Sequence, residues 1–130
     1  MIGYGNQGRA HALNLRDSGV QVVIGSDPGR RGWKSAEADA FSPVPIETAC
    51  AQADLAVIAL PDERHEQVWA ERIAPALRPG TVAGFLHGFS VHFGQVRPDH
   101  SIGVVLVAPK GPGHALRARY AAGQIGRAHV

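Results

Sequence analysis

The sequence predicts an α/β protein built on a doubly wound parallel sheet. Short apolar runs alternate with amphipathic segments along the chain, which is the pattern of parallel strands joined by helices. The clearest apolar run, residues 53–61, is hydrophobic almost throughout, as expected for a strand that helices cover on both faces. A chain of 130 residues is long enough to form one such domain.

Each element is predicted from its periodicity and from the glycine or proline that ends it. The strands are predicted over residues 20–25, 53–61, 81–88 and 102–109, with a shorter one near residues 43–46. The helices are predicted over residues 7–18, 33–40, 47–53, 63–74 and 114–121. Because parallel strands end along one edge of a sheet, we expect a ligand beside the ends of these strands.

The composition argues against several classes of protein. With 45% hydrophobic and 18% charged residues, the chain is expected to fold as a globular domain. The net charge is +2 and the cations are scattered, so the sequence does not favour a nucleic-acid surface. The single cysteine, Cys50, excludes an internal disulfide and favours a reducing compartment. No run has the length of a membrane span and no signal peptide is apparent, so we expect a cytoplasmic protein without a membrane partner.

A glycine motif opens the chain. Gly3-Tyr4-Gly5-Asn6-Gln7-Gly8 satisfies G-x-G-x-x-G and is followed by an amphipathic helix and then a strand. The first glycine permits a tight turn, the second lets the backbone approach a pyrophosphate, and the third lets helix and strand pack closely. The amides of the helix N-terminus would face the phosphates. In this context the motif predicts a Rossmann-like dinucleotide-binding domain, and a glycine-rich turn without a ligand is the alternative.

The residues that follow the strand predicted over residues 20–25 do not decide between NADH and NADPH. Asp27 stands where the acid that binds an adenosine ribose is expected, which favours NADH. Arg30 and Arg31 follow directly, and their guanidinium groups suit the 2′-phosphate of NADPH. Ser26-Asp27-Pro28-Gly29 is equally a favourable turn sequence.

Four segments resemble the N-terminal domain of ketol-acid reductoisomerase, also called acetohydroxy-acid isomeroreductase: GYGNQGRAHALNLRDSGVQVVIG, LPDE, HGFSVHFGQV and APKGPGH, in this order. The resemblance covers residues 2 to about 123. It implies an NADPH-dependent oxidoreductase and isomerase of valine and isoleucine biosynthesis, which moves an alkyl group within a 2-acetohydroxy acid such as 2-acetolactate and reduces the product to a 2,3-dihydroxy acid. Full-length members of the family are homo-oligomers and bind Mg²⁺ in a second, helical and knotted domain.

The resemblance also implies roles for individual residues. His87 and Lys110 match the active-site histidine and lysine, and both follow predicted strands. A loop histidine capping its own turn and a solvated loop cation are the simpler alternatives. No Mg²⁺ ligand is expected within these residues. The cofactor contacts are expected at Gly3, Tyr4, Gly5, Asn6, Gln7, Gly8, Asp27, Arg30, Arg31, Asp62, Glu63, Arg64, His65 and Gly113.

The loop around Asp27 departs from the family pattern G-L-R-x-G-S-x-S. Asp27 takes the position of the arginine, and Arg30 and Gly32 take the positions of the serines. NADPH remains the expected cofactor, because Arg30 and Arg31 could replace the lost phosphate contacts, and NADH is possible.

The extent of the chain is a further expectation. The strand that should precede Gly3 is reduced to Met1-Ile2, so we expect a partial NAD(P)-binding domain over residues 1–124 without the second domain. Residues 125–130, IGRAHV, are expected to be a non-native tail. Alone, such a fragment is expected to bind a dinucleotide without catalysing the reaction. The alternatives are a non-catalytic dinucleotide-binding module and another Rossmann dehydrogenase that reduces imines or β-hydroxy acids.

Overall fold

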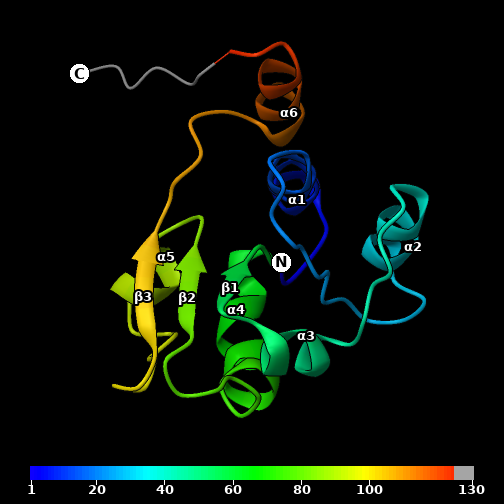
Figure 1. Ribbon diagram of the computed structural model, residues 1–130. Helices are drawn as coiled ribbons and strands as arrows, with labels where there is room; N and C mark the ends of the chain where they lie inside the picture. Colours follow the sequence, from blue (N-terminus) through cyan, green and yellow to red (C-terminus); the bar gives the residue numbers. More distant parts are fainter. Residues whose placement is uncertain (125–130) are drawn as a thin grey trace.

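A computed structural model describes residues 1–124, and the predicted tail at residues 125–130 lies outside the described part. Figure 1 shows a parallel sheet of β1 (Leu55–Ile58), β2 (Val82–Phe85) and β3 (Gly103–Leu106), in that order. Leu55 stands opposite Val82, and Val82 opposite Gly103. The predicted α/β class with a parallel sheet is therefore confirmed, and the three strands lie within the predicted runs.

Single parallel bridges extend this sheet beyond β1. Ile2 bridges both Ile58 and Gly25, and Gly25 also bridges Val44. The segments therefore lie in space in the order Val44, Gly25, Ile2, β1, β2, β3, which is the strand order 3-2-1-4-5-6 of a doubly wound dinucleotide-binding fold. The chain order reverses between Ile2 and β1, so the ligand crevice is expected there.

The predicted strand over residues 20–25 is wrong in its extent, because Gly25 is its only residue in a bridge, and the short strand near residues 43–46 likewise reduces to Val44. A strand is a ladder of successive pairs. The backbone bonds that are present lie close to Gly25: its N–H donates to the carbonyl of Met1 and the N–H of Gly3 donates to the carbonyl of Gly25, both at 2.9 Å, and the N–H of Ser26 donates to the carbonyl of Val44 at 3.0 Å.

The predicted helices all form, within a few residues of their expected ends. The predicted helix over residues 63–74 continues after Val68 as a π-helical turn, and a short helix after Gly88 had no signal in the sequence. The helices are α1 (Asn6–Asp17), α2 (Arg31–Ala38), α3 (Ile46–Gln52), α4 (Asp62–Val68), the π-helix η1 (Trp69–Ile73), α5 (Phe89–His92) and α6 (Gly113–Ala121).

Successive side chains of β1 point to two different hydrophobic clusters. Ala56 and Ile58 belong to a cluster with residues of α3, α4 and η1, whereas Val57 packs against a cluster formed by α1, α2 and the start of the chain. This alternation follows from the two-residue period of a strand. Helices therefore cover both faces of the sheet at β1, which accounts for the continuous apolar run in the sequence.

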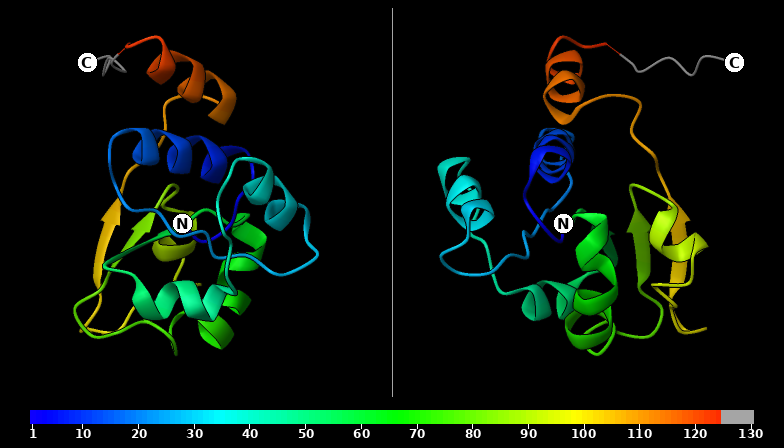
Figure 2. Two further views of the ribbon diagram at one scale, coloured as in Figure 1. Left: turned by 45° about the vertical axis from the view of Figure 1, so that its right-hand side comes forward. Right: turned by 180° about the vertical axis from the view of Figure 1, so that it is seen from behind.

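The last helix, α6, lies beside α1, as Figures 1 and 2 show from several sides. Arg117 of α6 donates to Asp17 Oδ2 at 2.6 Å and to Asn14 Oδ1 at 3.1 Å, both on α1. The segment between β3 and α6 therefore crosses from the carboxyl end of the sheet to the helix that carries the glycine motif.

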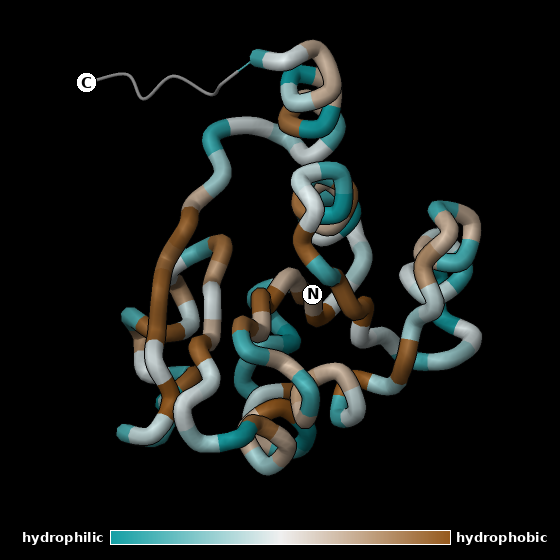
Figure 3. The backbone as a smooth tube through the Cα atoms, viewed as in Figure 1, coloured by the Kyte–Doolittle hydropathy of each residue, from teal (hydrophilic) through white to brown (hydrophobic). Residues whose placement is uncertain are grey.

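β3 is an edge strand in the described part of the chain. Val104, Val105 and Leu106 are 43–57% exposed, and Figure 3 shows this strand as a hydrophobic stretch. It therefore lacks the helical cover that β1 has. Within residues 1–124, no helix has the length and hydrophobicity that crossing a membrane requires.

Candidate dinucleotide-binding site

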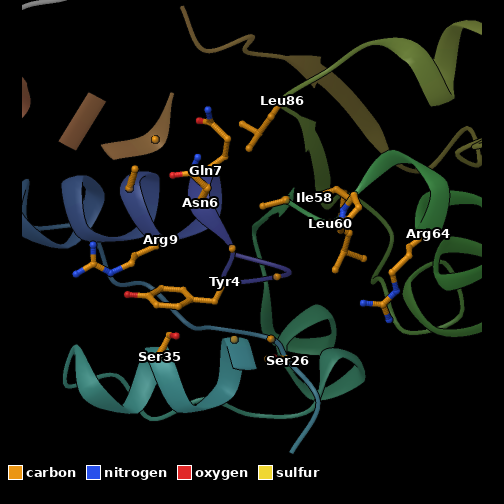
Figure 4. A pocket seen from close by; sticks show the side chains of 18 of the residues that line it. Tyr4, Asn6, Gln7, Arg9, Ser26, Ser35, Ile58, Leu60, Arg64 and Leu86 are labelled. Atoms are coloured by element: carbon orange, nitrogen blue, oxygen red, sulfur yellow. The ribbon is translucent and has the colours of Figure 1, made fainter. Parts of the chain in front are cut away.

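A cavity of about 980 Å³ lies at the carboxyl ends of the strands, where the strand order reverses. Figure 4 shows that its walls come from the start of α1, from α2, from the end of β1 and from α4. The structure brings most of the predicted site residues to this cavity: Gly3, Tyr4, Gly5, Asn6, Gln7, Asp27, Arg30, Arg31, Asp62, Arg64, His65, His87 and Gly113. Gly8, Glu63 and Lys110 are not among the residues that line it.

At two positions of the motif, a neighbouring backbone carbonyl lies so close that only glycine fits. Gly3 has a φ of +94°, and a Cβ atom there would stand 2.9 Å from the carbonyl oxygen of Ala59. A Cβ atom at Gly8 would stand 2.5 Å from the carbonyl oxygen of Gly3. A Cβ atom at Gly5 would meet nothing within 4 Å. Gly5 therefore faces open space on the cavity side, as a residue beside a pyrophosphate should.

The start of α1 is suited to an anion. Its N-cap, Gly5, offers no side-chain hydrogen bond, and the first turn carries no acidic residue. The first amides of a helix have no partner within the helix and lie at the positive end of its dipole. Amides of the Asn6–Gly8 turn are thus available to phosphate oxygens at the cavity wall.

Gln7 links the glycine motif to the loop before α6. Its Nε2 donates to the carbonyl of Gly111 at 3.0 Å, while its Oε1 is buried and has no hydrogen-bond partner among residues 1–124. Because a buried acceptor without a partner is costly, a ligand donor would improve this arrangement. The loop approaches closely here, since a Cβ atom at Gly113 would stand 2.1 Å from the carbonyl oxygen of Asn6.

Sequence reasoning missed Asp39, which ties the motif to α2. Asp39 accepts from the hydroxyl of Tyr4 at 2.8 Å and from Arg9 at 2.7 and 3.0 Å. Burial, followed by this carboxylate, raises the pKa of Tyr4, and the hydrogen bond from Arg9 lowers the pKa of Asp39. The Tyr4 side chain therefore has a structural partner. No local pattern pairs residues so far apart in the chain.

Asp27 also has a partner that the sequence did not indicate. Nη2 of Arg72, on η1, lies 2.8 Å from Asp27 Oδ1, and the same guanidinium pairs with Glu47. The hydrogen bond from Arg72 lowers the pKa of Asp27. The carboxylate at the ribose position is thus ionised and already paired with a cation.

Three other arginines surround this end of the cavity. Arg30, Arg31 and Arg64 line it, and none of them forms an ion pair within the described residues. Figure 4 shows Arg64 extending from α4. With Asp27 paired to Arg72, the local charge around the cavity is positive, which suits a phosphate group.

His65 is buried, with 2% of its side chain exposed, although it touches the cavity. Its Nδ1 lies 2.7 Å from Ser90 Oγ and its Nε2 lies 2.8 Å from the carbonyl of Leu60. Both ring nitrogens are therefore satisfied within the protein. Ser90, which sequence reasoning missed, is fully buried on α5.

The two predicted active-site residues differ in their surroundings. His87 is 65% exposed at the cavity, and its Nδ1 lies 3.0 Å from Asp62 Oδ2. Lys110 is exposed in the loop before α6, next to Pro109, which does line the cavity. In the part of the chain that the structure describes, no group of three or more His, Cys, Asp or Glu residues is arranged to hold a metal ion.

The strand order, the glycine motif at its reversal and the basic cavity beside it define a Rossmann-type dinucleotide-binding domain. The family model "Acetohydroxy acid isomeroreductase, NADPH-binding domain" matches residues 1–128. This chain belongs to that family. The family resemblance seen in the sequence is therefore confirmed.

Individual relatives agree with this assignment. The chain is 49% identical over 124 residues to "Ketol-acid reductoisomerase (NADP(+))" of Pyrobaculum arsenaticum and 48% identical to that of Pyrobaculum aerophilum. Each match covers 95% of this chain and 38% of the relative. The chain thus spans well under half the length of these relatives.

Solved structures show the same fold. The structure of an NADH-preferring ketol-acid reductoisomerase from an uncultured archean superposes with a TM-score of 0.89 at 38% identity, covering 94% of this chain and 38% of the other. A 3-hydroxyisobutyrate dehydrogenase of Mycobacterium tuberculosis superposes with a TM-score of 0.71 at 22% identity, over 90% of this chain and 42% of the other. The second likeness concerns the fold alone.

Proposed function

We propose that this chain is the cofactor-binding part of a ketol-acid reductoisomerase and that its cavity binds NADP(H). The observation that carries the proposal is the cavity itself, in which the Gly3–Gly8 motif and the basic residues around Asp27 line one continuous space. Bound NADPH would supply the hydride that reduces a keto group. The residues of the chain bind and orient the dinucleotide.

The cavity offers a place for each part of the cofactor. The amides at the start of α1 would hold the pyrophosphate, and the residues around Asp27 would hold the adenosine ribose. Gln7 Oε1 and the end of β2 lie toward the other end of the cavity, where the nicotinamide would be bound. Figure 4 shows the Gln7 side chain near Leu86, next to His87 in the sequence.

The charges favour NADPH over NADH. Asp27 would repel a 2′-phosphate if its charge were free, but Arg72 pairs with it at 2.8 Å. Arg30 and Arg31 then remain to bind the phosphate with charge-assisted hydrogen bonds. NADH is the second candidate, favoured by the carboxylate of Asp27 itself and by the likeness to an NADH-preferring enzyme.

The activity of the whole enzyme is part of the proposal. A longer protein containing this chain would convert a 2-acetohydroxy acid such as 2-acetolactate to a 2,3-dihydroxy acid, as a homo-oligomer. His87 would contact the substrate beside the nicotinamide, and Lys110 would stabilise developing negative charge on an oxygen. The Mg²⁺ ligands would lie outside residues 1–124, as the family resemblance implies. Residues 125–130 remain proposed as a tail outside the domain.

The test is a titration of the purified chain with NADPH and with NADH, followed by the rise in nicotinamide fluorescence. We expect binding of both, with NADPH about tenfold tighter, and loss of that preference in the R30A/R31A double variant. Lys34→Ala is the matched control, because Lys34 is an exposed cation on α2 outside the cavity.

Each outcome has a separate meaning. Tighter binding of NADH would favour the second candidate. Binding of neither dinucleotide would overturn the proposed site. If a longer protein containing this chain binds NADPH but does not turn over 2-acetolactate with Mg²⁺, the non-catalytic dinucleotide-binding module becomes the better account.

A further inference from the structure

Two side chains from neighbouring strand ends meet at the cavity. Asp62 begins α4 shortly after β1, and His87 follows β2. Because Ile58 and Phe85 are paired in the sheet, the two turns leave it side by side. His87 Nδ1 and Asp62 Oδ2 are 3.0 Å apart, and both residues line the cavity.

A buried hydrogen-bond chain joins the same two turns. His65 Nε2 lies 2.8 Å from the carbonyl of Leu60, which can only accept, so in the neutral ring this nitrogen carries the proton. Nδ1 of His65 then accepts from the hydroxyl of Ser90, at 2.7 Å. Leu60 precedes Asp62 and Ser90 follows His87, so this chain holds the Asp62 turn against the His87 turn.

We propose that Asp62 is a positioning residue for His87. Its carboxylate accepts a hydrogen bond from the Nδ1–H of His87, which leaves the lone pair on Nε2 of His87 to accept a hydrogen bond from a hydroxyl group of the bound substrate. The proposal rests on the proposed function and assigns to that site the recognition of a hydroxyl-bearing ligand. The tautomer of a histidine is set by the partner of its other nitrogen, and Asp62 is the partner within reach.

A purely structural role for Asp62 makes a different prediction. As an acid in the first turn of α4, Asp62 also interacts favourably with the helix dipole, as does Glu63. Loss of that interaction alone would lower stability slightly and would leave the tautomer of His87 unchanged. The two roles are therefore separated by observing the imidazole itself.

The first readout is the long-range ¹⁵N–¹H spectrum of histidine-labelled chain, with the His87 signals assigned through His87→Gln. We expect the Nδ1-protonated tautomer of His87 in the unmodified chain and a shift toward the Nε2-protonated tautomer in Asp62→Asn, whose amide can donate to Nδ1. Glu66→Gln is the matched control: it removes an equal charge from an exposed position of the same helix. If Asp62→Asn does not fold, Asp62→Ala gives the comparison, because it removes the acceptor of the hydrogen bond from Nδ1.

The second readout is turnover in a longer protein containing this chain. Asp62→Asn, assayed at saturating NADPH because Asp62 is also an expected cofactor contact, should lower kcat by about tenfold to a hundredfold and shift the His87 tautomer, because misorientation of a reacting group lowers the rate. Glu66→Gln should change neither. An unchanged tautomer in Asp62→Asn, or an unchanged kcat, would overturn the proposal. Failure to bind NADPH would overturn the proposed function instead, and the tautomer readout would still test the Asp62–His87 pair.

Discussion

Arg72 Nη2 lies 2.8 Å from Asp27 Oδ1, so the acid expected to bind the ribose is paired with a cation from a different helix. Arg72 reaches this loop because η1 packs beside α3, where Glu47 accepts from the same guanidinium. The pKa of Asp27 is lowered, first by this hydrogen bond. The charge at the end of the cavity that would hold the adenosine ribose therefore depends on Arg72, which lies outside the loop around Asp27.

Replacing Arg72 should shift the cofactor preference. In Arg72→Met the Asp27 carboxylate loses its partner and repels a 2′-phosphate, so the affinity for NADPH should fall about threefold to fivefold relative to NADH, as expected for a partly exposed ion pair. The measurement is the fluorescence titration of both dinucleotides. Arg78→Met, which removes an exposed cation paired with Asp54, should leave the ratio unchanged. An equal loss of affinity for NADPH and NADH would argue that Arg72 stabilises the fold and does not set the cofactor preference by neutralising Asp27.

Two glycines of the motif are expected to have different roles: Gly8 allows close packing within the protein, and Gly5 allows a ligand to approach the backbone. Gly8→Ala places a Cβ atom 2.5 Å from the carbonyl oxygen of Gly3, whereas Gly5→Ala meets nothing within 4 Å. We expect Gly8→Ala to lower the free energy of unfolding by about 2 kcal/mol or more, as an overpacked site does. Gly5→Ala should unfold at nearly the same denaturant concentration and lose affinity for both dinucleotides. Equal urea midpoints for the two variants would refute this assignment of roles.

The Asp39 carboxylate should contribute a pH-dependent part of the stability. The hydrogen bond from Arg9 lowers its pKa in the folded state, so the contribution is complete above the unfolded pKa of about 4. It is lost as the pH falls through the folded-state pKa. Asp39→Asn should therefore cost about 1 kcal/mol near pH 7 and progressively less below about pH 4.

The check on Asp39 is urea unfolding of both proteins across this pH range. Asp54→Asn is the control, because Asp54 is fully exposed and its contact with Arg78 is long, at 3.5 Å. A difference between Asp39→Asn and the unmodified chain that stays constant down to pH 3 would contradict the ionic origin of the effect.

The thiol of Cys50 should resist modification in the folded protein. Cys50 is 0% exposed in the main hydrophobic cluster, and burial raises its pKa to about 11. At pH 8 it is therefore protonated and inaccessible, and an aromatic disulfide reagent should react many times more slowly than in urea. Fast release of the coloured thiolate from the native chain would show that the cluster around α3 opens readily.

Much of the site was predictable because its signals are local. The spacing of Gly3, Gly5 and Gly8 predicted the turn and the helix that follows it, and the apolar run before His87 predicted its place at a strand end. The roles of His87 and Lys110 stay predictions, and so do the individual cofactor contacts. The predicted strand before Asp27 was overestimated, because β propensity does not supply the partner backbone that a ladder requires.

The sequence by itself determined the α/β class, the helices other than α5 and the position of the glycine motif, because backbone propensity and apolar periodicity act over a few neighbouring residues. The tertiary structure alone decided that Arg72 reaches Asp27, that Asp39 accepts from Tyr4 and Arg9, and that His65 joins Ser90. These pairs come from segments far apart in the chain, and the packing of helices on the sheet brings them together. Their charges and hydrogen bonds set the chemistry of the cavity, and no local pattern encodes which residues will meet.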